Sequence, residues 1–459
     1  LKEGTPAMPR PPRSRWMWFS AGATAAVVVA TAVLLWQRPT GPAEHTTAEP
    51  PTEELAVPSS VDAVEWTWEA PDGVAVRRVD RAAAGAVAVL DDGVVAVHGR
   101  TGAELWRYRH PGAAVDAGVT PDGRTVVVAV PDSGDGARLL TLDAATGETV
   151  AAVDGAEFAA PEHPNIGRLT SRTRVSLRSS GEETALVARD LRTDEVVWEF
   201  DGGPECALDD EDGVAVTVDL VLPVLLCGAD GTAFTEDGDA DALAAVVALD
   251  ARSGEQVWRQ EWTRPAQRPF PRIDVAADEE SYQDGLSSDG TAAVVDDPRL
   301  DGTPRVFDLR TGNEAADGLP EAPGAQTWFT GVGTETFVAV RVTEEGTVEY
   351  ERTDYSGTVT ARAAAPVPPD EFVVENSVLL ADAVVRLVPG PWVDGDGGPL
   401  MDRVEVAVVP WGADRAAHTV EVAAPEPLDG VEGLRLLPVP GAVVVTGAGE
   451  DTGALTGLR

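Results

Sequence analysis

Residues 249–258 read Leu-Asp-Ala-Arg-Ser-Gly-Glu-Gln-Val-Trp, a phrase that the chain repeats with variation. A close copy stands at 189–198, and another copy, without the tryptophan, stands at 307–316. A unit repeated along a chain decides its architecture, because each copy forms one small supersecondary structure that stacks on the next. The other copies lie at 97–106, 142–151 and 352–361.

Each copy places a polar turn between two apolar, alternating runs, which is the signature of a β-hairpin. Five copies have glycine at the turn, where it supplies the positive φ that such a loop needs. Asp194 replaces glycine in the third copy, and aspartate tolerates the left-handed region better than most residues. Four residues before the turn, an aspartate in four copies is placed to accept backbone N–H groups of the loop. The turn glycines are Gly102, Gly147, Gly254, Gly312 and Gly357, and the aspartates are Asp143, Asp190, Asp250 and Asp308.

The six turn positions are 45, 47, 60, 58 and 45 residues apart. A four-stranded propeller blade takes about 40–50 residues, so each copy is expected to belong to one blade, with insertions in some loops. A helical solenoid has a similar period, but the segments here alternate with period two and are interrupted by Gly and Pro. The repeat therefore predicts an all-β propeller.

The two ends of the repeat region predict how the ring closes. A seventh blade is expected over 378–422, and the runs 434–437, 442–446 and 454–458 then supply three strands without a fourth. Residues 64–69 resemble an outermost strand with no partner before it. If the two ends share one blade, no exposed sheet edge is left at the closure. We therefore expect eight blades, with seven as the alternative.

Charge limits the partners of the chain. Of 459 residues, 77 are acidic and 35 basic, which gives a formal net charge of −42, and Lys2 is the single lysine. Nucleic acid is excluded as an expected partner, because neutralising phosphates requires a basic surface. Lysine-based catalysis in the folded region is excluded as well. A GC-rich genome or a salty environment would each account for the acidity.

The segment 16–36 has no charged residue and would span roughly 31 Å as a helix, which matches a bilayer core. Trp16, Trp18 and Trp36 stand where interfacial aromatics belong. Arginines precede the segment and glutamates follow it, so the positive-inside rule places the N-terminus in the cytoplasm. We expect a cytoplasmic tail at 1–15, a transmembrane helix at 16–36, a solvated Pro/Thr/Glu-rich linker at 37–60 and the propeller at 61–459. A cleavable signal peptide is the alternative.

Few residues suggest chemistry. Cys206 and Cys227 are the only cysteines, and two thiols outside the cytoplasm are expected to pair, with two separate buried thiols as the alternative. Asp237, Asp239 and Asp241 resemble the start of a calcium loop, but Ala242 and Ala248 stand where that motif requires Gly and Glu. The five histidines have no metal-ligand spacing. The sequence therefore predicts no catalytic, cofactor-binding or metal-binding residue.

The phrase Leu-Asp-x-x-Ser/Thr-Gly-x-x-x-Trp resembles the repeat of quinoprotein-like propellers over most of residues 61–459. That family includes dehydrogenases dependent on pyrroloquinoline quinone (PQQ) and non-catalytic propellers such as the outer-membrane-assembly lipoprotein. The resemblance implies that Trp106, Trp198 and Trp258 dock onto neighbouring blades, and that the blades with Ala151, Ala316 and Ala361 at this position pack otherwise. The dehydrogenases carry an adjacent cysteine pair and a metal site of Glu, Asn and Asp, which this sequence does not show.

We therefore expect a single-pass protein of the cell membrane whose propeller lies outside and acts, without catalysis, as a binding or scaffolding module. The expected partner is an envelope protein or glycan, and strong negative charge would select basic patches. A PQQ-dependent sugar or alcohol oxidoreductase is the alternative, followed by a lyase or hydrolase that uses carboxylates at the channel mouth.

Overall fold

A computed structural model describes residues 42–131, 136–158, 164–180, 183–208, 213–228, 241–265, 271–275, 288, 290–297, 304–315, 319, 327–343, 347–366, 377–389, 392–395, 398–412, 416–428, 434–447 and 453–459. The chain divides into one unit at Leu1–Pro42 and a second at Ala43–Arg459. The predicted transmembrane segment 16–36 lies outside the described residues, and no helix in the described part is long and apolar enough to cross a bilayer.

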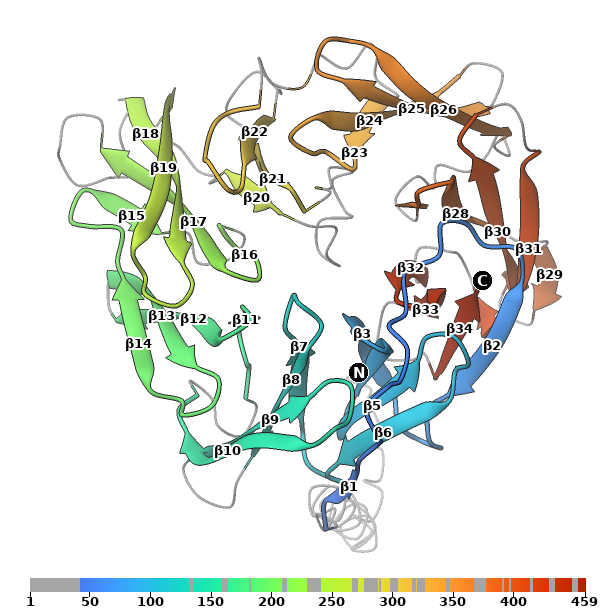
Figure 1. Cartoon of the computed structure of the whole chain (residues 1–459), viewed down its shortest axis with the longest axis horizontal. Coiled ribbons are helices and arrows are strands. Elements are labelled where there is room, and N and C mark those ends of the chain that lie inside the picture. Colours follow the sequence, from blue (N-terminus) through green and yellow to red (C-terminus); the bar gives the residue numbers. More distant parts are fainter. Residues whose placement is uncertain are drawn as a thin grey trace, which may run out of the picture. The chain divides into compact units, whose positions relative to one another are not determined.

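The second unit consists of eight antiparallel sheets set around a ring (Figure 1). Blade 1 contains β3 (Val76–Ala82), β4 (Gly85–Leu90), β5 (Gly93–His98) and β6 (Glu104–Arg109), and blade 2 contains β7 (Asp116–Val119), β8 (Thr125–Pro131), β9 (Ala137–Asp143) and β10 (Thr149–Ala156). Blade 3 contains β11 (Arg168–Leu169), β12 (Thr173–Ser180), β13 (Glu183–Asp190) and β14 (Val196–Phe200). Blade 4 contains β15 (Cys206–Leu208), β16 (Val214–Val216), β17 (Leu220–Gly228), β18 (Asp241–Asp250) and β19 (Gln256–Pro265).

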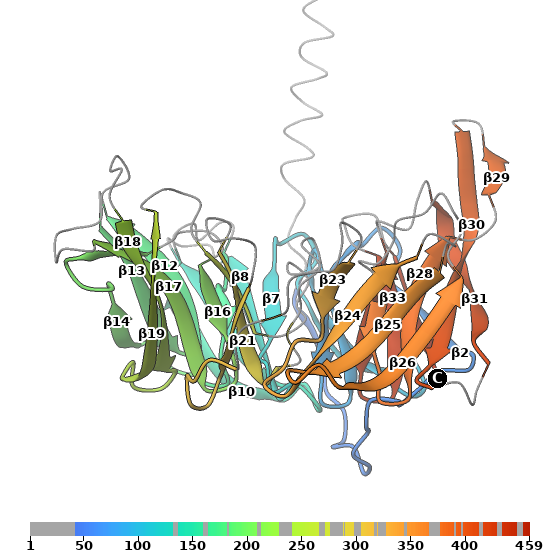
Figure 2. The ribbon, with the colours of Figure 1, turned by 90° about the horizontal axis from the view of Figure 1, so that it is seen from above.

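The remaining blades follow the same plan. Blade 5 contains β20 (Arg272–Asp274), β21 (Ala292–Asp296) and β22 (Arg305–Asp308), and blade 6 contains β23 (Thr327–Thr330), β24 (Thr336–Val342), β25 (Thr347–Asp354) and β26 (Val359–Pro366). Blade 7 contains β27 (Ser377–Leu379), β28 (Ala383–Pro389), β29 (Trp392–Gly395), β30 (Gly398–Pro410) and β31 (His418–Leu428). The β29–β30 hairpin stands out from one face of the ring (Figure 2).

Blade 8 closes the ring as the sequence predicts. It contains β32 (Leu434–Val439), β33 (Ala442–Gly447) and β34 (Ala454–Leu458), and its outer strand is β2 (Val64–Glu69) from the other end of the unit. Val64 pairs with Leu458 and Glu69 pairs with Ala454. The eight-bladed count is thereby confirmed against the seven-bladed alternative.

The repeat turns adopt the predicted conformation. All five turn glycines have positive φ, from 67° to 84°, and Asp194, with φ of 59°, is the one non-glycine residue in the described part that does so. The expected carboxylate contacts are present too, as at Asp250, whose Oδ1 accepts the backbone N–H of Ser253 at 2.8 Å. Asp143, Asp190 and Asp308 accept loop N–H groups in the same way.

The core lies between the blades. β4 is buried at every position and β8 at every position but its two ends, because the middle strands of a blade are covered on both faces by neighbouring blades. Such strands read as continuous apolar runs rather than as alternation. One cluster, for example, joins Val87 and Val94 of blade 1 to Val126 and Leu140 of blade 2. Burial between blades is therefore what holds the ring together.

The structure differs from the expected solvated linker. β1 (Glu44–Thr46) pairs with β6 as a fifth strand of blade 1. Further along, Leu55 is 8% exposed and the Ala56 carbonyl accepts the Gly441 N–H at 2.9 Å. The Pro- and Glu-rich composition suggested full solvation, but a few apolar and backbone contacts hold residues 43–60 on the propeller. We call this segment the strap.

Candidate functional site

Tryptophan docking joins successive blades. Trp106 is fully buried, and its Nε1 donates to the Ala144 carbonyl of blade 2 at 2.9 Å. Trp198 donates in the same way to Ala251 of blade 4 at 3.0 Å, and Trp258 donates to Leu309 of blade 5 at 2.9 Å. In each case the acceptor lies three residues before the turn of the following blade. The three tryptophans thus lie at blade interfaces, where the resemblance places them.

A fourth tryptophan does the same at the closure. Trp66 of β2 donates to the Gly99 carbonyl at 2.7 Å, and its ring lies against the turn glycine Gly102. Sequence reasoning missed Trp66, although it stands in the run 64–69 that was expected to close the ring. The available signal was that Trp66 stands in the outermost strand of its blade, as Trp198 and Trp258 do.

Blade 2 carries Ala151 in place of the tryptophan, and the contact with blade 3 changes accordingly. Thr141 donates to the Leu191 carbonyl, the acceptor that an indole takes elsewhere. Asp194, at the turn, accepts from Arg174 at 2.7 Å, and both side chains are buried. Both residues belong to blade 3, and they reach blade 2 through Glu157, whose carbonyl accepts from Arg174 at 2.7 Å and whose N–H donates to Asp194 at 3.1 Å, so polar contacts replace the aromatic contact at this interface. Ala316 lies outside the described residues. Beyond Ala361 of blade 6, Arg352 covers the Trp411 ring of blade 7 at 4.5 Å.

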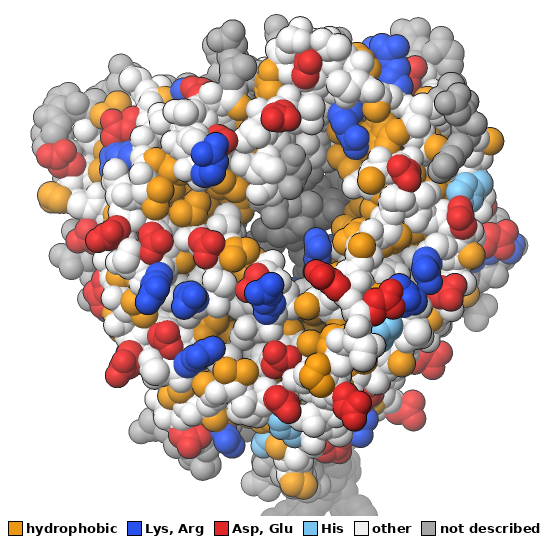
Figure 3. Space-filling model, viewed as in Figure 1, with side chains coloured by type: hydrophobic (Ala, Val, Ile, Leu, Met, Phe, Trp, Pro, Cys, Tyr) orange, Lys and Arg blue, Asp and Glu red, His pale blue; other side chains and the backbone are white. Residues whose placement is uncertain are grey.

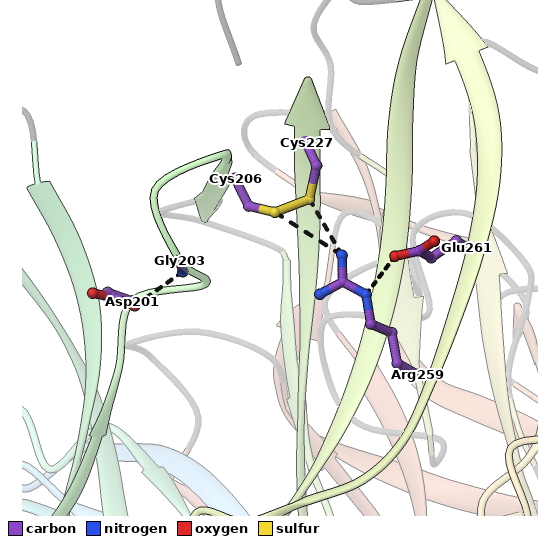
Figure 4. The surroundings of a disulfide bond; sticks show 6 residues. All are labelled: Asp201, Gly203, Cys206, Cys227, Arg259 and Glu261. Atoms are coloured by element: carbon purple, nitrogen blue, oxygen red, sulfur yellow. Dashed lines mark hydrogen bonds and ion pairs between the residues drawn. A yellow bond between two sulfur atoms is a disulfide. The ribbon is translucent and has the colours of Figure 1, made fainter. Parts of the chain in front are cut away.

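Cys206 and Cys227 are directly paired residues of β15 and β17, and a disulfide joins them (Figure 4). Cys227 is 4% exposed. The guanidinium of Arg259 lies beside the sulfurs, with Nη2 3.5 Å from the Sγ of Cys227, and is itself paired with Glu261 at 2.6 Å. A neighbouring cation favours the thiolate form of cysteine, so after reduction Arg259 would stabilise the thiolate of Cys227. The bond fastens the innermost strand of blade 4.

The outer rim carries a repeated exposed pair that sequence reasoning did not single out. Glu148, Glu195 and Glu255 each follow a turn and are exposed, and two residues later stand Val150, Val197 and Val257. These valines are 48%, 43% and 51% exposed, on the outermost strands of blades 2, 3 and 4. We call the six residues the Glu-Val rim. The regular Glu-x-Val spacing after the turn was a visible signal, because residues two apart lie on the same side of a strand.

The centre of the ring is hollowed on the face shown in Figure 3, with basic and acidic side chains around the hollow. Two charged groups of the innermost strand of blade 1 join it to blade 2. Arg78 of β3 pairs with Asp80 at 2.8 Å and also donates to the Ala117 carbonyl of blade 2. Asp80 in turn accepts the Val119 N–H at 3.2 Å. These contacts give the carboxylate a structural role.

In the described part, no three His, Cys, Asp or Glu side chains lie close enough to hold a metal ion. Asp237 and Asp239, from the incomplete calcium motif, lie outside the described residues.

Residues 90–218 match the model of a PQQ-type repeat family described as outer membrane protein assembly factor BamB. No curated protein matches the chain. Among solved structures, BamB from Moraxella catarrhalis is 14% identical, with 76% of this chain and 99% of that chain covered at a TM-score of 0.28. The propeller domain of the Trilobed protease from Pyrococcus furiosus is 12% identical, with 75% and 97% covered at 0.38. The WD40 domain of SCAP from fission yeast is 11% identical, with 91% and 98% covered at 0.37. Residues 90–218 are therefore similar to a PQQ-like repeat, and the described part of the chain forms an eight-bladed β-propeller.

Proposed function

We propose that this chain is an extracytoplasmic propeller, anchored in the cell membrane by residues 16–36, that binds an envelope protein and performs no catalysis. The observation that carries the proposal is the Glu-Val rim. Exposed apolar side chains repeated at one position on adjacent blades are a feature of interaction surfaces, whereas single exposed valines are ordinary. The match to a family model named for an assembly factor supports binding rather than chemistry.

The strap indicates how a partner is bound. β1 adds to the outer edge of β6, and the Ala48 N–H then donates to the Thr146 carbonyl of blade 2 at 2.8 Å. β10, β14 and β19 are likewise the last strands of their sheets. Their outer edges have the same backbone donors and acceptors, and an extended segment is the natural occupant of such an edge. The partner is therefore a protein with an extended segment that carries basic and β-branched residues, since glutamates flank the exposed valines.

The disulfide supports a location outside the cytoplasm. Such bonds persist in oxidising compartments and are rare where thiols are kept reduced. The formal charge of −42 supports a partner with basic patches, and it predicts binding that weakens as salt rises.

The test uses the full chain in its native membrane, with a photo-crosslinking residue placed at Val197. The matched control places the same residue at Thr360, which is exposed on an outermost strand, β26, and has Thr358 instead of an acidic residue two positions before it. We expect a discrete protein adduct from position 197 and none from 360. Adducts of equal yield from positions 197 and 360, or none from 197, would remove the rim from the proposal. Substrate-dependent dye reduction by the purified chain with PQQ and calcium would instead support the oxidoreductase alternative.

A further inference from the structure

Three arginines are buried between blades, and two of them face a carboxylate. Arg174 is 2% exposed and pairs with Asp194, and Arg264 is 1% exposed and pairs with Asp297 at 3.4 Å. Arg386 is 1% exposed, but no ion pair of the described residues includes it. Its Nε and Nη1 atoms are buried without a hydrogen-bond partner. Arg386 is thus a buried charge that the described part of the chain does not neutralise.

The position of Arg386 defines its surroundings. On β28, Val385 and Leu387 pack into the cluster shared with blade 8, whereas Val384 packs with Val340 and Tyr350 of blade 6. Side chains alternate along a strand, so Arg386 faces blade 6 together with Val384. Ser377 of β27 is the residue paired with Arg386. Because β27 is the innermost strand and Ser377 is half-buried, this position borders the centre of the ring.

Tyr350 adds a second buried polar group. Its side chain is fully buried, and its hydroxyl makes no well-formed hydrogen bond. Burial raises the pKa of Tyr350, while the charge of Arg386 and the nearby Ser377 and Arg386 donors lower it. The phenol is therefore neutral and keeps its proton to donate. Arg386 and Tyr350 lie next to each other with unused donors.

We propose that Arg386, Tyr350 and Ser377 form a binding site for a small oxyanion between blades 6 and 7. A guanidinium cannot lose its proton in a protein, and burying it without a counter-charge costs several kcal/mol even after relaxation. The guanidinium presents donors and no acceptor, which excludes a cation and matches the oxygens of a carboxylate or phosphate.

The test measures thermal stability and binding heat of the purified full-length chain with sodium phosphate or sodium acetate, with NaCl adjusted to equal ionic strength. A ligand that binds only the folded state raises the melting temperature in proportion to the logarithm of its concentration above Kd. We expect both anions to raise the melting temperature, or phosphate alone if the site requires a tetrahedral oxyanion. Absence of any rise with either anion would overturn the proposal.

Arg386→Met replaces the charge with an apolar chain of similar length, and the anion effect is expected to vanish. Its melting temperature without anion should equal or exceed that of the parent, because an uncompensated charge has been removed. The control, Arg341→Met, removes an exposed arginine of blade 6 and should keep the full response.

Tyr350→Phe is a milder second variant, expected to weaken phosphate binding about tenfold by loss of one hydrogen bond to a charged group. An equal response in Arg386→Met and the parent would assign the effect to the surface. Strong destabilisation by Arg386→Met, with no anion effect in the parent, would show that a carboxylate of the chain itself occupies the site. Either result contradicts the proposal.

Discussion

The docking of each tryptophan against a turn glycine predicts that Gly254→Ala will disrupt one blade interface. A Cβ at Gly254 would lie 2.6 Å from Cγ of Trp198 and 2.9 Å from its Cδ2. Ordinary carbon contacts are about 3.5–4.0 Å, so the indole must move by about 1 Å. That movement breaks the hydrogen bond from Trp198 Nε1 to the Ala251 carbonyl.

Gly357→Ala is the matched control. Gly357 is a turn glycine with φ of 84°, against 70° for Gly254, but a Cβ there meets nothing within 4 Å. Both substitutions pay the left-handed strain of about 1–2 kcal/mol. Both also restrict the unfolded chain equally, so this contribution cancels in the comparison. The difference between the two variants therefore isolates the contact with the tryptophan.

The expected difference follows from two parts. Forcing extra volume into a packed interface costs about 1–3 kcal/mol, and losing the indole hydrogen bond costs about 1 kcal/mol. Gly254→Ala should thus be less stable than Gly357→Ala by about 2–4 kcal/mol. In a single domain of this size, about 1 kcal/mol shifts the melting temperature by roughly 2–4 °C or less, so the gap is measurable by calorimetry or circular dichroism.

A double-mutant cycle sharpens the assay. Trp198→Val removes the ring that collides with the new methyl group, so adding Gly254→Ala to it should cost only the backbone strain. Equal destabilisation by Gly254→Ala and Gly357→Ala would refute the docking argument. A cost for Gly254→Ala that is unchanged in the Trp198→Val background would refute it as well.

Three further predictions concern single interactions. Asp194→Ala leaves Arg174 buried without its carboxylate, so thermal unfolding should show that the free energy of unfolding falls by about 3–5 kcal/mol. A fall of less than about 1 kcal/mol would mean that solvent reaches the guanidinium. Reduction of the disulfide, or replacement of Cys206 and Cys227 by serine, should lower the free energy of unfolding by about 3 kcal/mol, given the sequence separation of 21 residues. An unchanged melting temperature after reduction would contradict this prediction. Burial acts to raise the pKa of Asp250, but the hydrogen bonds from Ser253 and the loop N–H groups lower it overall. The carboxylate therefore stabilises the folded state at neutral pH, and this contribution is lost as pH falls through the folded-state pKa. Asp250→Asn should flatten this part of the pH–stability profile, and an unaltered acid limb would show that the turn carboxylate is not linked to folding.

The repeat made most of the ring predictable, because each feature of the phrase has a local physical cause. A glycine or aspartate at the turn follows from positive φ, and the carboxylate four residues earlier follows from loop hydrogen bonding. The closure was predictable because a strand without partners at one end matched three strands without a fourth at the other. Asp194 shows the limit of this reasoning. Its tolerance of positive φ was visible, but its pairing with Arg174 of β12 depends on how the strands of its own blade are arranged in space.

The strap and the partners of the buried arginines could not be predicted from the sequence, for different reasons. Residues 43–60 have the composition of a solvated linker, and only the neighbouring edge of β6 makes Glu44–Thr46 a strand. Arg386 stands inside the apolar run Ala383–Pro389, so a charge in a buried strand was visible in the sequence. Whether such a charge meets a carboxylate is decided by the facing blade, which a single sequence does not identify.

At four of the five turn glycines a tryptophan of the preceding blade lies against the glycine; the exception is Gly357, whose preceding copy of the repeat ends in Ala316. Gly102, Gly147, Gly254 and Gly312 each face a tryptophan, and a methyl group at any of them would lie 2.6–2.7 Å from the ring. Where the tryptophan is Ala151, the following turn has Asp194 instead of glycine. Positive φ alone is satisfied by either residue, so φ does not explain the distribution. At the four turns that face a tryptophan, the approach of the indole requires glycine, since only a residue without a Cβ leaves room for the ring. At these four turns the glycine is therefore required by the neighbouring blade as much as by its own loop, whereas at the turn that follows Ala151 the absence of an indole leaves room for the side chain of Asp194.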